Sequence, residues 1–138
     1  MKYLVSGGGG FVASHLVRYL MSKGEETIST VRWNEDLSRI DGLDIKTISV
    51  DLTDLSACIR CLQEVKPDYV IHLAAQSFVP DSFMNPLATL RTNVEGSANL
   101  FEAIRLTEID PIIYVAGSSE YYGDVSPNEI PIKETNPS

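Results

Sequence analysis

The stretch Ser6-Gly7-Gly8-Gly9-Gly10-Phe11-Val12-Ala13-Ser14-His15 follows the short apolar run Tyr3-Leu4-Val5 and decides the fold of this 138-residue chain. The apolar run predicts a strand, and the residues after the glycines have helical spacing. A strand, a glycine turn and a helix N-terminus in this order form a phosphate cradle, because Gly7 permits a tight turn and Gly10 carries no Cβ. The alternative is that four consecutive glycines form only a flexible loop. The flanking strand and helix favour the cradle.

Composition excludes several classes of function. The chain is 43 % hydrophobic and 22 % charged, which is enough apolar material for one domain with a core. Its net charge of −8 argues against a nucleic-acid partner and against an anionic membrane surface, since both need clustered Lys and Arg. The apolar runs are too short to span a bilayer, and no signal-peptide pattern precedes the first strand. We therefore expect a cytoplasmic location.

The two cysteines, Cys58 and Cys61, have the C-x-x-C spacing of redox and zinc sites. They fall, however, in a segment with helical spacing, where they share the apolar side with Leu55, Leu62 and Val65. A second pair of metal ligands is absent from the sequence. We therefore predict that both cysteines are small core residues, and we predict no metal site.

Strand and helix patterns alternate along the chain. We expect strands at 2–6, 27–31, 45–50, 69–73 and 111–116, helices at 11–22, 54–65 and 82–106, and a loop over 117–138. Asp51 or Thr53 is expected to cap the second helix. Apolar strands that alternate with helices predict an α/β fold with a doubly wound parallel sheet, in which the ligand lies beyond the carboxyl ends of the strands. Four segments that follow strands should converge there: the glycine loop, Asp51-Leu52, Leu73–Ser77 and Gly117–Glu120.

Four stretches give the chain a family resemblance: Gly7–Ala13, Asp51-Leu52, His72–Ser77 and Asn93–Gly96. With them, the chain resembles the extended short-chain dehydrogenase/reductase family of nucleotide-sugar epimerases, dehydratases and reductases. The stretch Ser118-Ser119-Glu120-Tyr121-Tyr122-Gly123 is similar to one in GDP-mannose 4,6-dehydratases and GDP-4-keto-6-deoxymannose reductases. The resemblance implies a Rossmann domain over residues 1–138, a GDP- or dTDP-linked sugar as substrate and a homodimer formed through the helix around 87–106.

The resemblance also implies a nicotinamide dinucleotide as cofactor. The residues expected to bind it are Gly7, Gly9, Gly10, Phe11, Val12, Arg32, Asp51, Leu52, Leu73, Ala74, Ala75, Gln76 and Asn93. Two positions depart from the family pattern: Ala13 replaces the third glycine, and Val31 followed by Arg32 replaces the acid that holds the ribose of NAD. Because an Arg at this position suits a 2′-phosphate, we predict NADP, with NAD as the alternative. The alternative for Arg32 is a solvated loop charge.

For catalysis, the resemblance implies a site at Ser118, Ser119 and Glu120. Ser118 would hydrogen-bond the sugar C4 oxygen during hydride transfer, or else it only caps the loop. Glu120 stands where dehydratases have a base at C5. His72 and His15 are predicted to be structural.

The family's catalytic Tyr-x-x-x-Lys does not follow the proline-rich segment 131–137. Tyr19 and Lys23 match that spacing, but they lie on the first helix, away from the nicotinamide. We therefore expect an N-terminal fragment that is truncated before the last strands and the sugar lobe, and that is inactive alone. Two rival hypotheses are a non-catalytic NADP sensor and a self-associating structural fragment.

Overall fold

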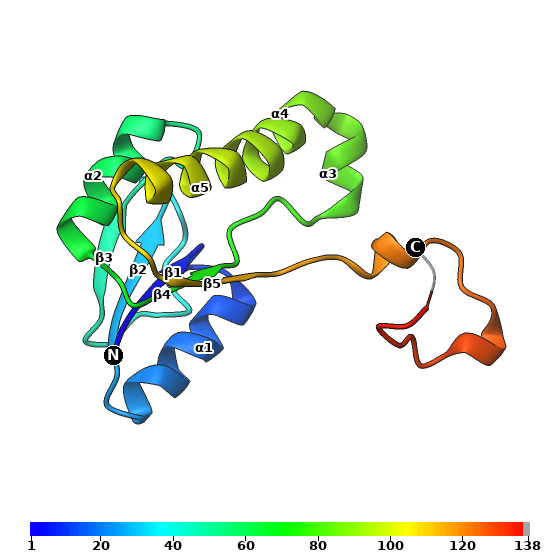
Figure 1. The fold of residues 1–138 in the computed structure, drawn as a ribbon, viewed down its shortest axis with the longest axis horizontal. Helices are drawn as coiled ribbons and strands as arrows, with labels where there is room; N and C mark the ends of the chain where they lie inside the picture. The colour runs from blue at the N-terminus through cyan, green and yellow to red at the C-terminus, as the bar shows by residue number, and fades with distance from the viewer. Residues whose placement is uncertain (137–138) are drawn as a thin grey trace.

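The computed structural model describes residues 1–136 and contains a five-stranded parallel sheet (Figure 1). The strands are β1 (Lys2–Ser6), β2 (Glu26–Val31), β3 (Lys46–Ser49), β4 (Tyr69–His72) and β5 (Ile112–Val115), in the spatial order β3-β2-β1-β4-β5. In the register of the central strands, Leu4 pairs with Ile28 on one side and with Val70 on the other. The prediction of a doubly wound parallel α/β sheet of the Rossmann type is confirmed.

Helices cover both faces of this sheet. Helix α1 (Phe11–Ser22) lies on one face, and α2 (Leu55–Val65) and α5 (Gly96–Leu106) lie side by side on the other (Figure 1). Because successive strand residues point to opposite faces, Leu4 belongs to the core under α2 and α5, whereas Val5 packs with Ala13 and Val17 of α1. Ala13, in place of a third family glycine, is buried where the helix packs closely on the strand.

Helix α2 begins and ends on clear local signals. Asp54 is its N-cap and accepts hydrogen bonds from the N–H groups of Ser56 and Ala57, at 2.9 and 3.2 Å. The expectation that Asp51 or Thr53 caps this helix is therefore wrong. The two residues bond to each other instead, because the Asp51 carboxylate accepts from both the N–H and the hydroxyl of Thr53. The helix ends at Lys66, which has a positive φ and precedes Pro67.

The predicted continuous helix over 82–106 is wrong. The structure instead has α3 (Val79–Met84), α4 (Pro86–Leu90), a π-helical turn η1 (Arg91–Glu95) and α5. Asn85 separates the first two with φ −133° and ψ 61°, because a residue before proline is disfavoured in the helical region. Farther along, Gly96 lies close to the loop after β3: a Cβ there would lie 3.3 Å from the Leu52 Cβ.

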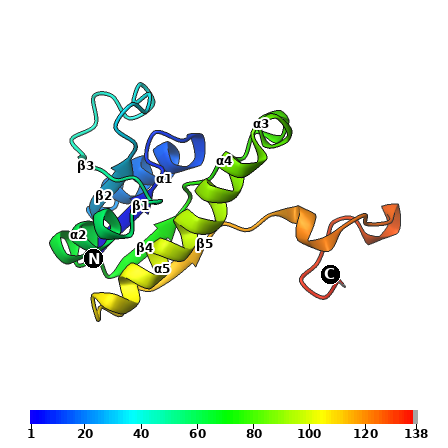
Figure 2. The ribbon, with the colours of Figure 1, turned by 90° about the horizontal axis from the view of Figure 1, so that it is seen from above.

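The segment after β5 leaves the sheet. The Ala116 N–H still donates to the His72 carbonyl, at 3.2 Å, but the hydrogen bonds within residues 117–136 join only near neighbours in sequence. Figures 1 and 2 both show this segment leading away from the other elements. Two short 3-10 helices, Ser119–Tyr122 and Pro127–Glu129, interrupt the predicted loop. Among residues 1–136, no helix is long and apolar enough to cross a membrane.

Candidate functional site

A cleft of about 820 Å³ lies at the carboxyl ends of the strands, a size typical of small-molecule and cofactor sites. Strand β1 has β2 on one side and β4 on the other: β2 and β3 are added to the sheet on one side of β1, and β4 and β5 on the other, so the order of strand addition reverses between β1 and β4. This switch point is where open α/β sheets bind ligands, since the loops on its two sides diverge. The cleft is lined by residues of the loops after β1, β2, β3 and β4, by residues of α3 and by Thr92 of the turn η1.

The glycine loop after β1 is held tightly to the sheet. Gly7 has φ +77°, and its N–H, like that of Gly8, donates to the Thr30 carbonyl of β2, at 3.1 and 2.9 Å. The loop then closes with a bond of 2.9 Å from the Gly10 N–H to the Gly7 carbonyl. Gly10 is the N-cap of α1 and gives its first turn no side-chain hydrogen bond. The positive end of this helix is therefore available to an anion in the cleft.

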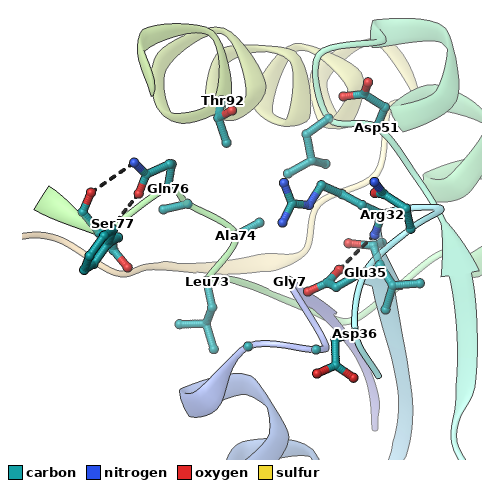
Figure 3. Close-up of a pocket in the computed structure, with 18 of the residues that line it drawn as sticks. Gly7, Arg32, Glu35, Asp36, Asp51, Leu73, Ala74, Gln76, Ser77 and Thr92 are labelled. Atoms are coloured by element: carbon teal, nitrogen blue, oxygen red, sulfur yellow. Dashed lines mark hydrogen bonds between the residues drawn. The ribbon is translucent and has the colours of Figure 1, made fainter. Parts of the chain in front are cut away.

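Charged side chains from the loop after β2 line the opposite wall. Arg32 extends its guanidinium into the cleft, and Glu35 and Asp36 lie on the same side (Figure 3). Arg39, from the same loop, also lines the cleft. The Glu35 carboxylate accepts a hydrogen bond from the Arg32 N–H, at 2.9 Å, and lies over Gly9, where a Cβ would come within 2.7 Å of it. Sequence reasoning missed Glu35 and Asp36, because their polar loop has no periodicity that would indicate where side chains point.

Asp51 completes this side of the cleft from the end of β3 (Figure 3). The hydrogen bonds that it accepts from the N–H and the hydroxyl of Thr53 lower the pKa of its carboxyl group. The bonds from Ser38 have the same effect on the pKa of Asp36. Both carboxylates therefore remain ionised at neutral pH, beside the two arginines.

The loop after β4 forms the third wall. Leu73, Ala74, Ala75, Gln76 and Ser77 line the cleft, and Ala74 packs against Gly7. Asn93, from the π-helical turn, holds this loop from behind: its side chain accepts from the Gln76 N–H at 2.7 Å and donates to the Gln76 carbonyl at 2.9 Å. The neighbouring Thr92 lines the cleft, whereas Asn93 is not among the lining residues.

Residues 4–138 match the family model described as GDP-mannose 4,6 dehydratase. The chain belongs to this family. It is 37 % identical to a GDP-mannose 4,6-dehydratase of Vibrio cholerae, over 99 % of this chain and 40 % of that protein. It is 31 % identical to a UDP-glucose 4-epimerase of Lactobacillus helveticus, over 99 % of this chain and 41 % of that protein. The chain thus spans about two-fifths of the length of these relatives, and the resemblance to extended short-chain dehydrogenases/reductases is confirmed.

Comparison with solved structures agrees with this family assignment. A UDP-glucose 4-epimerase of Thermus thermophilus in complex with NAD matches with a TM-score of 0.87 and 31 % identity, over 99 % of this chain and 44 % of that one. A UDP-glucose 4-epimerase of Bifidobacterium longum in complex with NAD⁺ and UDP matches with a TM-score of 0.85 and 28 % identity, over 100 % of this chain and 42 % of that one. Both of these structural neighbours thus carry a nicotinamide cofactor.

In this family member, the cleft brings together most of the predicted cofactor residues: Gly7, Gly9, Gly10, Arg32, Asp51, Leu52, Leu73, Ala74, Ala75 and Gln76. Phe11 and Val12 lie beside it, at the N-terminus of α1, with exposed side chains. Of the four segments that the sequence predicts to converge at the ligand site, three line the cleft: the glycine loop, Asp51-Leu52 and Leu73–Ser77.

The fourth, Gly117–Glu120, does not line the cleft, because the chain leaves the sheet after Ala116. Ser118, Ser119 and Glu120 are exposed there, and the Ser118 hydroxyl accepts from the Glu120 N–H at 3.2 Å as the cap of a short turn. Their catalytic roles stay predictions.

Two structural interpretations are confirmed. His72 is only 4 % exposed and its ring is hydrogen-bonded on both nitrogens, to Ser6 and Ser97. Cys58 and Cys61 are buried in the core, where burial raises the pKa of each thiol to about 11. Because the thiolate is the reactive and metal-binding form, both cysteines are inert packing residues at neutral pH.

Proposed function

We propose that the cleft binds NADP, as the cofactor-binding part of a nucleotide-sugar enzyme that transfers a hydride at C4 of the sugar. The observation that carries the proposal is the position of the cleft at the switch point between β1 and β4, beside a helix N-terminus without a side-chain cap. The NAD complexes of the Thermus and Bifidobacterium epimerases support a dinucleotide at this place.

The residues of the cleft fit a dinucleotide. The N–H groups at the start of α1, including those of Phe11 and Val12, would hold the pyrophosphate, and Gly10, which lines the cleft as the N-cap of α1, carries no side chain to obstruct its approach. Asp51, Leu52 and the loop Leu73–Gln76 line the remaining walls and would contact the rest of the dinucleotide. When bound, the nicotinamide ring supplies hydride transfer.

Arg32 is the feature that favours NADP over NAD. Its guanidinium extends into the cleft from the end of β2, where a planar, permanently charged group can bind a 2′-phosphate with two hydrogen bonds (Figure 3). The carboxylates of Glu35 and Asp36 line the same wall and oppose the phosphate charge. NADP selectivity therefore depends on the balance between these groups.

Ser118, Ser119 and Glu120 are proposed to act on the sugar. The Ser118 hydroxyl can donate and accept, so it can follow the C4 oxygen from alcohol to ketone while Ser119 helps to position the sugar. Glu120 would take the C5 proton in a dehydration. The 138-residue chain, in which these residues lie outside the cleft, is expected to turn over neither a GDP- nor a dTDP-linked sugar.

We also propose a cytoplasmic homodimer. Leu87 and Leu90 on α4 and Val94 in the following turn are exposed, Leu87 by 77 %, although they are large apolar side chains. An apolar stripe of this kind is typical of an interface. Light scattering should give the mass of a dimer, and Leu87→Asp together with Leu90→Asp should give that of a monomer. A monomeric parent chain would contradict this part of the proposal.

Isothermal titration calorimetry with NADP⁺ and NAD⁺ tests the cofactor. NADP⁺ should bind more tightly, and Arg32→Ala should weaken NADP⁺ binding by about tenfold, the value of one charge-assisted contact, with little effect on NAD⁺. Arg60→Ala is the matched control, since Arg60 is exposed on α2 and pairs only loosely with Asp54, at 3.8 Å. Tighter binding of NAD⁺ would contradict NADP selectivity, and binding of neither would contradict a dinucleotide site.

A further inference from the structure

A chain of polar groups, buried at Ser6 and His72 and half-buried at Ser97, runs behind the cleft from β1 through β4 to α5. The Ser6 hydroxyl lies 2.8 Å from Nδ1 of His72, and Nε2 of His72 lies 2.9 Å from the Ser97 hydroxyl. Ser97 in turn donates to the Asn93 carbonyl, at 2.6 Å. No buried side-chain polar atom of residues 1–136 lacks a hydrogen-bond partner, so the buried members of this chain of polar groups are all hydrogen-bonded.

The protons of this chain follow from counting donors and acceptors. The Ser6 oxygen accepts from the N–H groups of Leu73 and Ala74, both at 3.1 Å, and these fill its two lone pairs. Its contact with His72 must therefore be a bond that Ser6 donates, and Nδ1 accepts it. The imidazole proton then lies on Nε2 and is donated to Ser97, whose own proton goes to Asn93. His72 is neutral in this arrangement.

This chain of polar groups supports the loop after β4 at two points. Ser6 holds the N–H groups of Leu73 and Ala74, and the Asn93 side chain holds both backbone groups of Gln76. His72 and Ser97 connect these two supports. The supported loop lines the cleft opposite Gly7.

We propose that His72 is a positioning residue for cofactor binding: as the neutral Nε2–H tautomer it orients Ser6, which fixes the loop Leu73–Gln76 against the glycine loop. The inference rests on the proposed function, since it assumes that the cleft holds a dinucleotide. His72 touches neither cofactor nor substrate in this role.

Protonation of His72 should loosen the loop. A proton on Nδ1 converts an acceptor into a donor that faces the Ser6 oxygen, whose lone pairs are already occupied, so a bond to Leu73 or Ala74 must be lost. The neighbours of His72 on the adjacent elements are Ser6 on β1, Val115 on β5, and Ser97 and Phe101 on α5. None of these side chains carries a charge, and burial lowers the pKa of His72. Binding should therefore weaken only as the pH falls below neutrality.

Calorimetry with NAD⁺ at one pH above and one pH below the NMR titration midpoint of His72 tests this, because the phosphodiesters of NAD⁺ keep their charge there, whereas a phosphate monoester such as that of NADP titrates near pH 6. The affinity of the parent chain should fall by about fivefold, the value of one hydrogen bond. His72→Asn, whose amide oxygen accepts from Ser6 and does not titrate, should remove this dependence. His15→Asn, the matched change at the other of the two histidines, should leave it intact. A pH-independent affinity of the parent chain, or loss of the dependence in His15→Asn, overturns the inference.

NMR of the cofactor-free chain separates this inference from the proposed function and needs no variant. The His72 nitrogens should show the Nε2–H tautomer, and the amide signals of Leu73 and Ala74 should follow the titration of His72. An Nδ1–H tautomer, or amides that do not respond, overturns the inference. If neither NAD⁺ nor NADP⁺ binds at either pH value, the proposed function is wrong, and the NMR result still decides whether His72 positions the loop.

Discussion

Gly7 and Ala74 touch across the floor of the cleft: a Cβ on Gly7 would lie 2.9 Å from the Ala74 Cα and 3.1 Å from its nitrogen. These are backbone atoms, so neither residue can yield by rotating a side chain. The contact joins the loops after β1 and β4, the two strands between which the ligand site lies. The absence of a side chain at Gly7 therefore sets how closely the two loops approach at the floor of the cleft.

Gly7→Ala should damage both stability and cofactor binding. It adds the clash with Ala74 to the strain of a non-glycine residue at φ +77°, so we expect a loss of about 2–4 kcal/mol in the free energy of unfolding. Gly24→Ala is the matched control, since Gly24 has φ +74° with no atom within 4 Å of the added Cβ. It should cost about 1 kcal/mol and leave binding unchanged. Urea unfolding and calorimetry measure both effects, and equal losses in the two variants would contradict a role for the contact.

Asn93→Ala should loosen the loop after β4. The substitution removes two hydrogen bonds and leaves the partly buried N–H and carbonyl of Gln76 without these partners. The loss should lower the free energy of unfolding by about 1–3 kcal/mol. Hydrogen exchange at the Gln76 amide should become faster. Asn136→Ala, which removes a single bond to the exposed Lys133 N–H, should change neither quantity. Unchanged exchange at Gln76 would show that Asn93 does not hold the loop.

Glu35→Gln should shift the cofactor preference toward NADP. Glutamine keeps an acceptor for the Arg32 N–H but removes a negative charge from the wall where the 2′-phosphate is proposed to bind. We expect the ratio of NADP⁺ to NAD⁺ affinity to rise by about three- to tenfold. Glu64→Gln, which lies on α2 and pairs with Lys46, is the charge-matched control. If both variants change the ratio equally, the effect comes from net charge and not from the wall.

Stability should fall in mild acid because of His72. Burial lowers its pKa below the usual value of about 6.5, so the unfolded chain binds more protons, and the stability contributed by the neutral ring is complete above that pH and is lost as the pH falls through the lowered pKa. The two aspartates of the cleft whose carboxyl pKa is lowered, Asp36 and Asp51, act in a lower window: their contribution is present above pH 3.8 and is lost as the pH falls below it. Urea unfolding between about pH 7 and pH 5 should show the first loss in the parent chain and not in His72→Asn.

The sequence predicts the sheet and α1 well, because both depend on local patterns. The strand Lys2–Ser6 and the helix Phe11–Ser22 have the predicted bounds. The run Tyr3-Leu4-Val5 is apolar throughout because both faces of its strand are covered by helices. The glycine loop could be placed in the site since its function depends on the backbone alone.

The path of the chain between β4 and α5 could not be predicted in the same way. Apolar spacing continues across Asn85, although the proline after it breaks the helix there. The π-helical turn at Arg91–Glu95 brings Asn93 to Gln76 and leaves no pattern in the sequence. The place of Glu35 in the cleft could not be predicted for a related reason: its carboxylate accepts from the nearby Arg32 N–H in an irregular loop, and no sequence spacing indicates such a contact.

An NMR titration of the ¹⁵N-labelled chain with NADP⁺ tests the central claim most directly, because it shows both whether the dinucleotide binds and where. The amide signals of Gly7, Gly9 and Gly10 and of the loop Leu73–Gln76 should shift together and saturate, while those of the exposed face of α4 stay in place. Signals that do not move at excess NADP⁺, or shifts confined to α4 and α5, would contradict a cofactor site in this cleft.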